Sequence, residues 1–308
     1  MTGTSVPRVV VVSRPTEYAA LLARHGTREQ ARFFLESRGR TVDQAIARDD
    51  AQRAALAVIA GAIPADWRRA RVDRADLDRF LFEPNDIVVT VGSSGLVANV
   101  AKYLDGQLVI GVNPDPSVHA GIVASHAPQA AVALIAAAAA GAVVTDERVM
   151  VEAVLDDGQR TLALNEIFVG HASHQTARYT LRCQAGEERQ ASSGIVVTTG
   201  TGASGWGRSI ANERHSLMAM PAPDEPSLVF FVREAWPSGT YDARITEGRL
   251  EEGTDLSVTS GLDAGGVIFG DGIEGDRLEF RWGVTARIGV AQNRLRLVTG
   301  YSMPRSSR

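Results

Sequence analysis

Residues 86–104, "DIVVTVGSSGLVANVAKYL", combine a strand pattern, a glycine turn and a helix pattern in one short segment. Its apolar run Ile87–Val91 predicts a buried strand, residues 92–95 predict a tight turn, and the apolar periodicity over residues 97–103 predicts a helix. Two glycines let the backbone approach an anion, and the N–H groups that open a helix point at it with the positive end of the helix dipole. The stretch therefore predicts a phosphate-binding loop, although the turn has no carboxylate, lysine or arginine for chemistry.

The residues around this loop alternate between strand and helix patterns. We expect strands at residues 8–13 and 107–113, and helices at residues 17–24, 28–37, 44–60 and 128–141. Alternation of this kind is typical of an α/β domain with a parallel sheet.

The pattern changes to strands after Glu147. Residues 148–155 and 160–170 flank the turn Asp156-Asp157-Gly158, which predicts a hairpin. Further strands are expected at residues 176–183, 193–200, 227–234, 249–260, 265–272, 276–283, 287–292 and 294–300. The sequence therefore predicts an α/β plus β fold: an α/β domain over residues 1–125, a β-rich domain over 126–295, and a C-terminal segment, 296–308, that can return to the first domain.

Composition excludes several classes of protein. The chain has 308 residues, of which 44% are hydrophobic and 22% charged, so it can bury a core, and its net charge of −4 provides no general attraction to nucleic acid or anionic membranes. The N-terminus lacks the apolar core of a secretion signal, and the longest apolar run, residues 130–144, is too short to cross a bilayer. The single Cys183 excludes an internal disulfide. We expect a cytoplasmic protein without nucleic acid or membrane partners.

A second glycine loop occurs in "GIVVTTGTGASGWGRSI", residues 194–210. Residues 200–205 match the G-x-G-x-x-G fingerprint of Rossmann dinucleotide sites, but the surrounding segments look like strands, and no acidic residue is evident on a following strand. We therefore disfavour a Rossmann site. The glycines and the hydroxyls of Thr199, Thr201 and Ser204 suit a polyhydroxylated or phosphorylated ligand. The alternative is a glycine-rich hairpin loop.

Other catalytic patterns are weak. Neither loop has the G-x-S-x-G spacing of a nucleophile elbow. His171 and His174 have a spacing that can ligate a metal, but without a third ligand a solvated loop is the better interpretation. We therefore expect no metal site in the protein alone.

The motifs in their order along the chain resemble the NAD kinase family, most closely its mitochondrial-type and related bacterial branch. The similar segments are "VVTVGSSGLVANVAKYL", "VIGVNPDP", "ERVMVEAVL", "ALNEIFVG", "SSGIVVTTGTGASGWG" and "FGDG". They correspond to the Gly-Gly-Asp-Gly loop with its strand and helix, the Asn-x-Asp-Pro turn, an Arg-containing strand, the Asn-Glu motif, the Thr-Pro-Thr-Gly-Ser-Thr-Ala-Tyr stretch and a late Asp-Gly motif. The resemblance covers roughly residues 86–300.

This resemblance implies an N-terminal Rossmann-like α/β domain, a C-terminal β-sandwich-like domain and a ligand cleft between them. It implies a kinase that transfers a phosphate from ATP, with Mg²⁺, to a ribosyl hydroxyl of NAD(H), giving NADP(H). It also implies a homo-oligomer, a dimer or tetramer, in which the second subunit contributes to the site. The short strands of the second domain, whose edges need covering, favour an oligomer as well.

Carried over motif by motif, the resemblance implies three groups of nucleotide-binding residues. Phosphates would lie against the first loop, Asn165 and Glu166 would hold a ribose or the nicotinamide side of NAD, and the second loop would line an adenosine pocket with the aromatic face of Trp206. The complete expected set is Gly92, Ser93, Gly95, Leu96, Asn113, Asn165, Glu166, Thr199, Thr201, Gly202, Ser204 and Trp206.

The chain departs from the family at Ser94, which occupies the position of the catalytic aspartate. A serine hydroxyl neither accepts a proton as a carboxylate does nor neutralises a divalent ion, and losing a general base typically lowers the rate by about 10² to 10⁴. Asp115 or Asp271 could act in its place if either reaches the ligand, and Ser94→Asp is expected to raise NADP formation. The alternatives are a non-catalytic binder of NAD(P)(H) or another adenine nucleotide, and a kinase of the same fold with another hydroxyl substrate.

Overall fold

The computed structural model describes residues 6–116 and 121–301. The chain divides into two compact units: unit 1 comprises Met1–Val100, Gln107–Asp146 and Arg296–Arg308, and unit 2 comprises Ala101–Gly106 and Glu147–Leu295. Unit 1 is α/β and unit 2 is mostly β, so the protein has a two-unit α/β plus β fold. Within the described residues, no helix has the length and apolar character needed to span a membrane.

Unit 1 contains a parallel sheet with the strand order β2-β1-β3-β4-β16. The strands are β1 (Arg8–Ser13), β2 (Arg68–Asp73), β3 (Ile87–Val91), β4 (Leu108–Val112) and the C-terminal part of β16 (Thr285–Tyr301). The four valines Val9, Val10, Val11 and Val12 of β1 are all buried, as is typical of a parallel strand covered on both faces.

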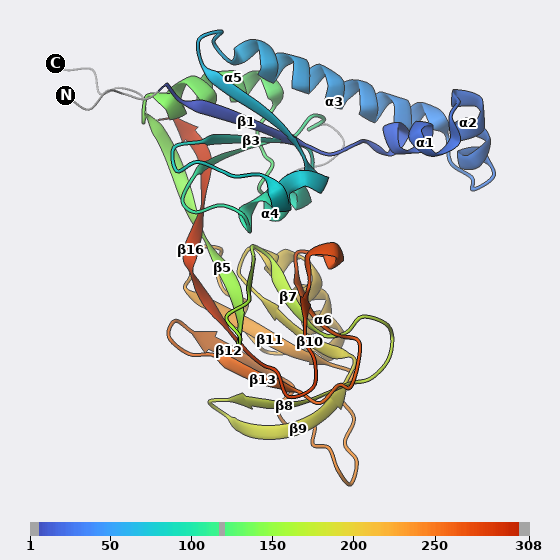
Figure 1. Ribbon diagram of the computed structural model, residues 1–308, viewed down its shortest axis with the longest axis vertical. Helices are drawn as coiled ribbons and strands as arrows, with labels where there is room; N and C mark the ends of the chain where they lie inside the picture. Colours follow the sequence, from blue (N-terminus) through green and yellow to red (C-terminus); the bar gives the residue numbers. More distant parts are fainter. Residues whose placement is uncertain (1–5, 117–120, 302–308) are drawn as a thin grey trace, which may run out of the picture. The chain divides into compact units, whose positions relative to one another are not determined.

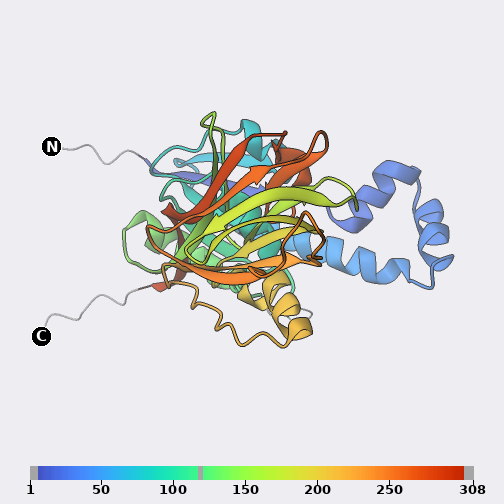
Figure 2. The ribbon, with the colours of Figure 1, turned by 90° about the horizontal axis from the view of Figure 1, so that it is seen from below.

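Helices cover both faces of this sheet (Figure 1). On one face, α3 (Val42–Ala62) and α5 (Pro128–Ala139) pack on alternate residues of β1 and β3. The short α4 (Ser94–Ala101) lies on the other face. Helices α1 (Glu17–His25) and α2 (Arg28–Glu36) form a small core with the start of α3 and lie away from the sheet (Figure 2), and η1 (Arg74–Arg79) follows β2.

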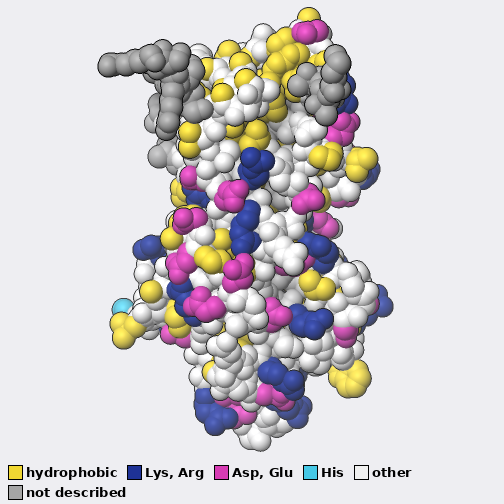
Figure 3. All heavy atoms as spheres, turned by 90° about the vertical axis from the view of Figure 1, so that its left-hand side faces the viewer, with side chains coloured by type: hydrophobic (Ala, Val, Ile, Leu, Met, Phe, Trp, Pro, Cys, Tyr) yellow, Lys and Arg dark blue, Asp and Glu magenta, His cyan; other side chains and the backbone are white. Residues whose placement is uncertain are grey.

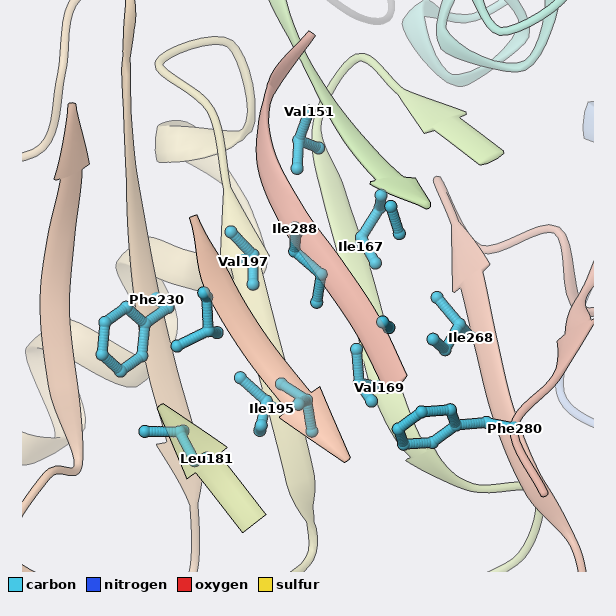
Figure 4. Close-up of a cluster of buried hydrophobic side chains, with 14 of the residues drawn as sticks. Val151, Ile167, Val169, Leu181, Ile195, Val197, Phe230, Ile268, Phe280 and Ile288 are labelled. Carbon is cyan, nitrogen blue, oxygen red and sulfur yellow. The ribbon is translucent and has the colours of Figure 1, made fainter. Parts of the chain in front are cut away.

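Unit 2 consists of two packed sheets. One is antiparallel in the order β12-β11-β10-β7-β14-β15, formed by β7 (Glu166–His171), β10 (Gly194–Thr198), β11 (Ser227–Arg233), β12 (Glu247–Glu251), β14 (Gly266–Gly270) and β15 (Leu278–Glu279). The other contains β8 (Ala177–Cys183), β9 (Gly186–Ser192), β13 (Leu256–Ser260) and the first part of β16, together with the hairpin of β5 (Val143–Leu155) and β6 (Arg160–Ala163). Side chains such as Ile167, Phe230 and Ile288 fill the space between the sheets (Figure 4).

Several expected elements differ from the structure. Helix α4 begins at Ser94 rather than at residue 97, and the expected strand at 160–170 divides into β6 and β7 at a turn. The expected strands at 287–292 and 294–300 are one strand, β16. The strands β2 and β9 and the helix α6 (Trp206–Arg214) were not expected, because their polar residues mask the apolar period.

The boundary between the units also differs from the expected one. A boundary at 125/126 would separate α5 from unit 1, but α5 packs on β3, β4 and α3, and unit 1 continues to Asp146. Strands β5 and β16 each continue along the chain from one unit into the other, and the division assigns Arg296–Arg308 to unit 1.

The surface in Figure 3 carries acidic and basic side chains close to one another. Exposed ion pairs bring opposite charges together. Examples are Arg182–Glu187 and Arg68–Glu83, with N–O distances of 2.5 and 2.9 Å. Charges mixed in this way cancel over short distances, so this face has no large area of a single sign.

Candidate functional site

The first glycine loop (residues 92–95) connects β3 to α4 in unit 1. The N–H of Gly92 donates to the carbonyl of Val112 on β4 at 2.9 Å, so this donor is already used within the sheet. Leu96 is fully buried, and a Cβ at position 92 would lie 3.1 Å from its Cδ2. Leu96 therefore packs against the loop at position 92. Its side chain has no exposed surface for a nucleotide, whereas the sequence predicted Leu96 as a nucleotide-binding residue.

The rest of this loop offers donors to an anion. The N–H groups of Ser93, Ser94 and Gly95 form no hydrogen bond with the described residues, as is usual for the first turn of a helix. Gly95 is exposed, and the nearest atom to a Cβ there would be Ser93 Oγ at 3.8 Å. A phosphate can therefore approach the backbone at this point.

Arg14 adds a cation that the sequence interpretation missed. Its guanidinium donates to Ser93 Oγ at 3.3 Å, and the residue is exposed. Arg14 directly follows β1, which is the parallel neighbour of β3, with Val12 paired to Thr90. Because parallel neighbours end at the same edge of a sheet, the residue after β1 lies beside the residue after β3. That rule could have identified Arg14 from the sequence.

The side chain of Ser94 forms hydrogen bonds within the protein. Its Oγ accepts from three consecutive backbone N–H groups, those of Ile122, Val123 and Ala124, at 3.1, 3.3 and 3.5 Å. Three successive amides that converge on one oxygen form a small anion-type nest, here filled by a hydroxyl. The Ser94 hydroxyl therefore anchors the 122–124 segment.

Asn113 and Asp115 lie in a turn at the end of β4. The Asn113 N–H donates to the His126 carbonyl at 2.8 Å, and its Oδ1 accepts from the Asp115 N–H at 3.1 Å. Asn113 is buried, so its side chain stabilises the turn that presents Asp115. Asp115 belongs to unit 1, as does the first loop.

The second glycine loop (residues 199–205) lies in unit 2, where it connects β10 to α6 through the short helix η2 (Gly202–Ser204). A helix follows the glycines, so the loop is not a hairpin. The pairing of β10 with β11 is antiparallel, which argues against a Rossmann site because a Rossmann unit needs parallel strands.

The glycines of the second loop are required by packing within the protein. A Cβ at Gly200 would lie 2.0 Å from the Ala222 carbonyl oxygen, and one at Gly202 would lie 2.3 Å from the Asn165 carbonyl oxygen. Thr199 is fully buried: its hydroxyl donates to Leu164 O at 2.6 Å and accepts from the N–H groups of Thr201 and Gly202. These contacts join the second loop directly to the turn that carries Asn165 and Glu166.

Three polar groups remain unpaired at this junction. The hydroxyl of Thr201 is buried, with 6% of the residue exposed, and it forms no hydrogen bond. The side chains of Asn165 and Glu166 are partly buried, and among the described residues neither has a hydrogen bond or ion pair. An unpaired buried hydroxyl costs about 1–3 kcal/mol, so a ligand that supplies the missing partners would be stabilised here. Ser204 at the same loop is exposed.

Asp271 holds the Asn165–Glu166 turn in place. Its carboxylate accepts from the N–H groups of Leu164 and Asn165, both at 2.8 Å, and of Glu166 at 3.3 Å. Burial raises the pKa of Asp271 to about 6, although the three N–H groups and the nearby Lys102 oppose this shift. Burial, and secondarily the charge of Asp271, raises the pKa of Glu166 to about 7. The carboxylate of Asp271 is thus hydrogen-bonded to the backbone, whereas the carboxylate of Glu166 has no hydrogen bond among the described residues.

A buried cation, Lys102, acts on the carboxylate of Asp271. Lys102 is the only lysine in the sequence, its side chain is 4% exposed, and its Nζ is 2.5 Å from Asp276 Oδ2. The Tyr103 hydroxyl also donates to Asp276, at 2.7 Å. The hydrogen bonds from Lys102 and Tyr103 lower the pKa of Asp276 against the effect of its burial. Sequence patterns did not identify this group, because Asp276 is far from Lys102 in the chain.

Trp206 has protein partners on its ring. It stacks on Phe168 with a centroid distance of 5.7 Å and an interplanar angle of 16°, and the Arg233 guanidinium lies 5.2 Å from its centroid. A purine that stacked on Trp206 would have to use the part of the ring that Phe168 and Arg233 leave open, or displace the Arg233 side chain.

Candidate metal ligands do not gather into one group in the described part of the chain. Among residues 6–116 and 121–301, no three His, Cys, Asp or Glu side chains form a group able to hold an ion. The Nδ1 atom of His171 forms hydrogen bonds with Ser173.

The chain shows no match to a known family model or to a curated protein.

Proposed function

We propose that this protein is an NAD kinase-like phosphotransferase, which binds NAD(H) and MgATP and transfers the terminal phosphate to a ribosyl hydroxyl, giving NADP(H). The observation that carries the proposal is the junction in unit 2, where Asn165, Glu166 and Thr201 present unpaired polar groups on two segments bonded to each other. An amide, a carboxylate and a hydroxyl are suited to the paired hydroxyls of a ribose.

The first loop supports the phosphate part of the proposal. Unpaired N–H groups at Ser93, Ser94 and Gly95, the start of α4 and the guanidinium of Arg14 together provide donors and positive charge for a triphosphate. The chemistry of phosphoryl transfer depends mainly on positioning and charge stabilisation, which such groups can provide.

Calorimetry tests the binding part of the proposal. NAD, NADH, NADP and ATP are titrated into the protein, with GTP as the non-adenine control, and Asn165→Ala and Thr201→Val are compared with the parent. Each variant should weaken NAD binding by about 1–3 kcal/mol, because a buried hydrogen bond is lost. Absence of dinucleotide binding at millimolar concentration would contradict the proposal. A coupled assay for NADP then tests the transfer.

One observation favours a second function, a non-catalytic binder of NAD(P)(H) or another adenine nucleotide. Ser94 replaces the expected carboxylate, and its hydroxyl is bonded to the 122–124 backbone, so the first loop contains a binding surface without a general base. Tight NAD binding without NADP formation, at any pH and with MgATP, would favour this function.

Homo-oligomerisation remains part of the proposal. In the described sheets, β2, β9 and β12 lie at edges, and each pairs with one neighbouring strand. An edge strand tends to be covered by another chain or by charged side chains. Light scattering at micromolar concentrations should give more than the mass of one chain, and a monomer mass throughout would contradict this part.

A further inference from the structure

Two carboxylates lie at the same turn of unit 2 but differ in what they contact. Both oxygens of Asp271 accept backbone N–H groups from residues 164–166. The carboxylate of Glu166 accepts none among the described residues and has no ion pair, although the residue is only partly exposed. A half-buried carboxylate without a donor is energetically unfavourable unless a ligand or a proton compensates for it.

Burial, and secondarily the charge of Asp271, keeps the affinity of Glu166 for a proton high. Lys102 opposes the protonation of Asp271, and both Lys102 and Tyr103 contact Asp276. The ammonium of Lys102 is directed at Asp276 rather than at Glu166. Burial and the charge of Asp271 then raise the pKa of Glu166 to about 7, which is near the value at which a general base works best at neutral pH.

We propose that the Glu166 carboxylate is the proton acceptor for the ribosyl hydroxyl. The inference rests on the proposed function. Asp271 is a positioning residue, since it holds the turn through three N–H groups and leaves Glu166 free to meet the substrate.

The step balances as follows. The ribosyl oxygen forms a bond to the terminal phosphorus of MgATP while the bond from that phosphorus to the leaving oxygen of ADP breaks. The hydroxyl proton moves to a carboxylate oxygen of Glu166 and is later released to water. The products are NADP, MgADP and one proton, and no further reactant is needed.

The other candidates in the chain fit this role less well. The Ser94 hydroxyl has no charge to accept a proton and is bonded to three backbone amides. Both carboxylate oxygens of Asp271 already accept hydrogen bonds from backbone N–H groups. Glu166 alone combines an unbonded carboxylate with the junction that carries Asn165 and Thr201.

Kinetics on three variants test the inference. Glu166→Gln should lower the rate of NADP formation at pH 8 by about 10² to 10⁴ and remove the fall in rate on the acid side of pH 7 that the parent should show. Glu166→Asp, which keeps the charge, should recover part of the rate. Glu213→Gln on the exposed side of α6 removes the same charge elsewhere and should match the parent.

Calorimetry provides a readout that does not depend on turnover. An ionised Glu166 accepts a hydrogen bond from a ribosyl hydroxyl more strongly than the protonated acid does, so NAD binding at pH 6.5 should release protons from the parent. Titration of NAD in two buffers of different ionisation enthalpy measures this release, and Glu166→Gln should abolish it.

The outcomes separate the two proposals. If the parent forms NADP, and Glu166→Gln keeps its rate within about threefold with the same acid limb, Glu166 is not the acceptor and the proposed function stands. If the parent itself binds NAD but forms no NADP, the proposed transfer is wrong and the role of Glu166 falls with it. A large rate loss in Glu166→Gln together with abolished proton release supports both.

Discussion

The two glycine loops look alike in sequence but differ in the physical role of their glycines. In the first loop Gly95 is exposed, and nothing in the protein comes closer than 3.8 Å to the place of its missing Cβ. In the second loop Gly200 and Gly202 lie within 2.0 and 2.3 Å of backbone carbonyl oxygens. The first loop leaves its backbone open to a ligand, whereas the second needs glycine to pack against its own protein.

The comparison shows that glycine content alone does not locate a ligand. In the first loop, the groups available to a ligand are backbone N–H groups and the guanidinium of Arg14, which suit an anion. In the second, they are the side chains of Thr201, Asn165 and Glu166, which suit hydroxyls and amides. Unpaired polar groups therefore distinguish the two loops better than their glycine patterns do.

The largest effect is expected at Gly202. In Gly202→Ala the new methyl would meet the carbonyl of Asn165, which is backbone and cannot move aside, so the free energy of unfolding should fall by about 2–4 kcal/mol. Gly95→Ala is the matched control in the first loop, where alanine favours the helix and should raise stability by up to about 1 kcal/mol. Urea unfolding measures both, and equal stability of the two variants would break the comparison.

The next largest effect is expected at Glu166, the partly buried carboxylate beside the second loop. The pKa of Glu166 is raised to about 7 in the folded protein, so the fold binds this proton more tightly than the unfolded chain does. Its contribution to stability is present below pH 4.5 and is lost as the pH rises through 7. Glu166→Gln should therefore be more stable than the parent by about 1–3 kcal/mol at pH 8, with little difference at pH 4.5. Urea midpoints at both pH values, with Glu213→Gln as control, measure this dependence; a pH-independent difference would contradict it.

Ser94 tests whether the first loop is held by its hydroxyl. Ser94→Ala removes the acceptor of three N–H groups and should lower the free energy of unfolding by about 1–2 kcal/mol. Ser94→Asp retains an acceptor and should preserve stability. The amides would also lower the pKa of the new carboxylate, so its gain in NADP formation should be smaller than the sequence comparison alone implies. A gain of a hundredfold or more in a coupled NADP assay would show that residue 94 reaches the substrate.

The smallest effect is expected at Arg14, because it is exposed. Arg14→Gln should leave the unfolding free energy unchanged and weaken ATP binding by about three- to tenfold, an effect that should shrink as salt is added. Arg32→Gln on the exposed face of α2 makes the same charge change away from the first loop and serves as the control. Equal ATP affinity in both variants would contradict a role of Arg14 in the proposed phosphate-binding surface.

Local patterns were sufficient for much of the fold. The apolar runs of β1 and β3 gave strands with the expected bounds, Arg8–Ser13 and Ile87–Val91, because a buried strand needs continuous apolar residues on both faces. They were insufficient for β9 and α6, whose sequences GEERQAS and WGRSIANER are polar on the exposed side. The start of α4 was also missed, because serine and glycine fit a turn and a helix N-terminus equally well.

Local patterns predict the two-part α/β plus β organisation and the places of the two glycine loops, because hydrophobic periodicity and turn residues act over a few neighbouring positions. Which polar groups are paired depends instead on how the chain folds. Asp271 meets Leu164 across 107 positions of the chain, Arg14 meets Ser93 across 79, and Ser94 meets Ile122 across 28. Hydrogen bonds over such separations depend on how whole elements pack, so the partners of Ser94 and Asp271 follow from the folded chain and not from any short motif.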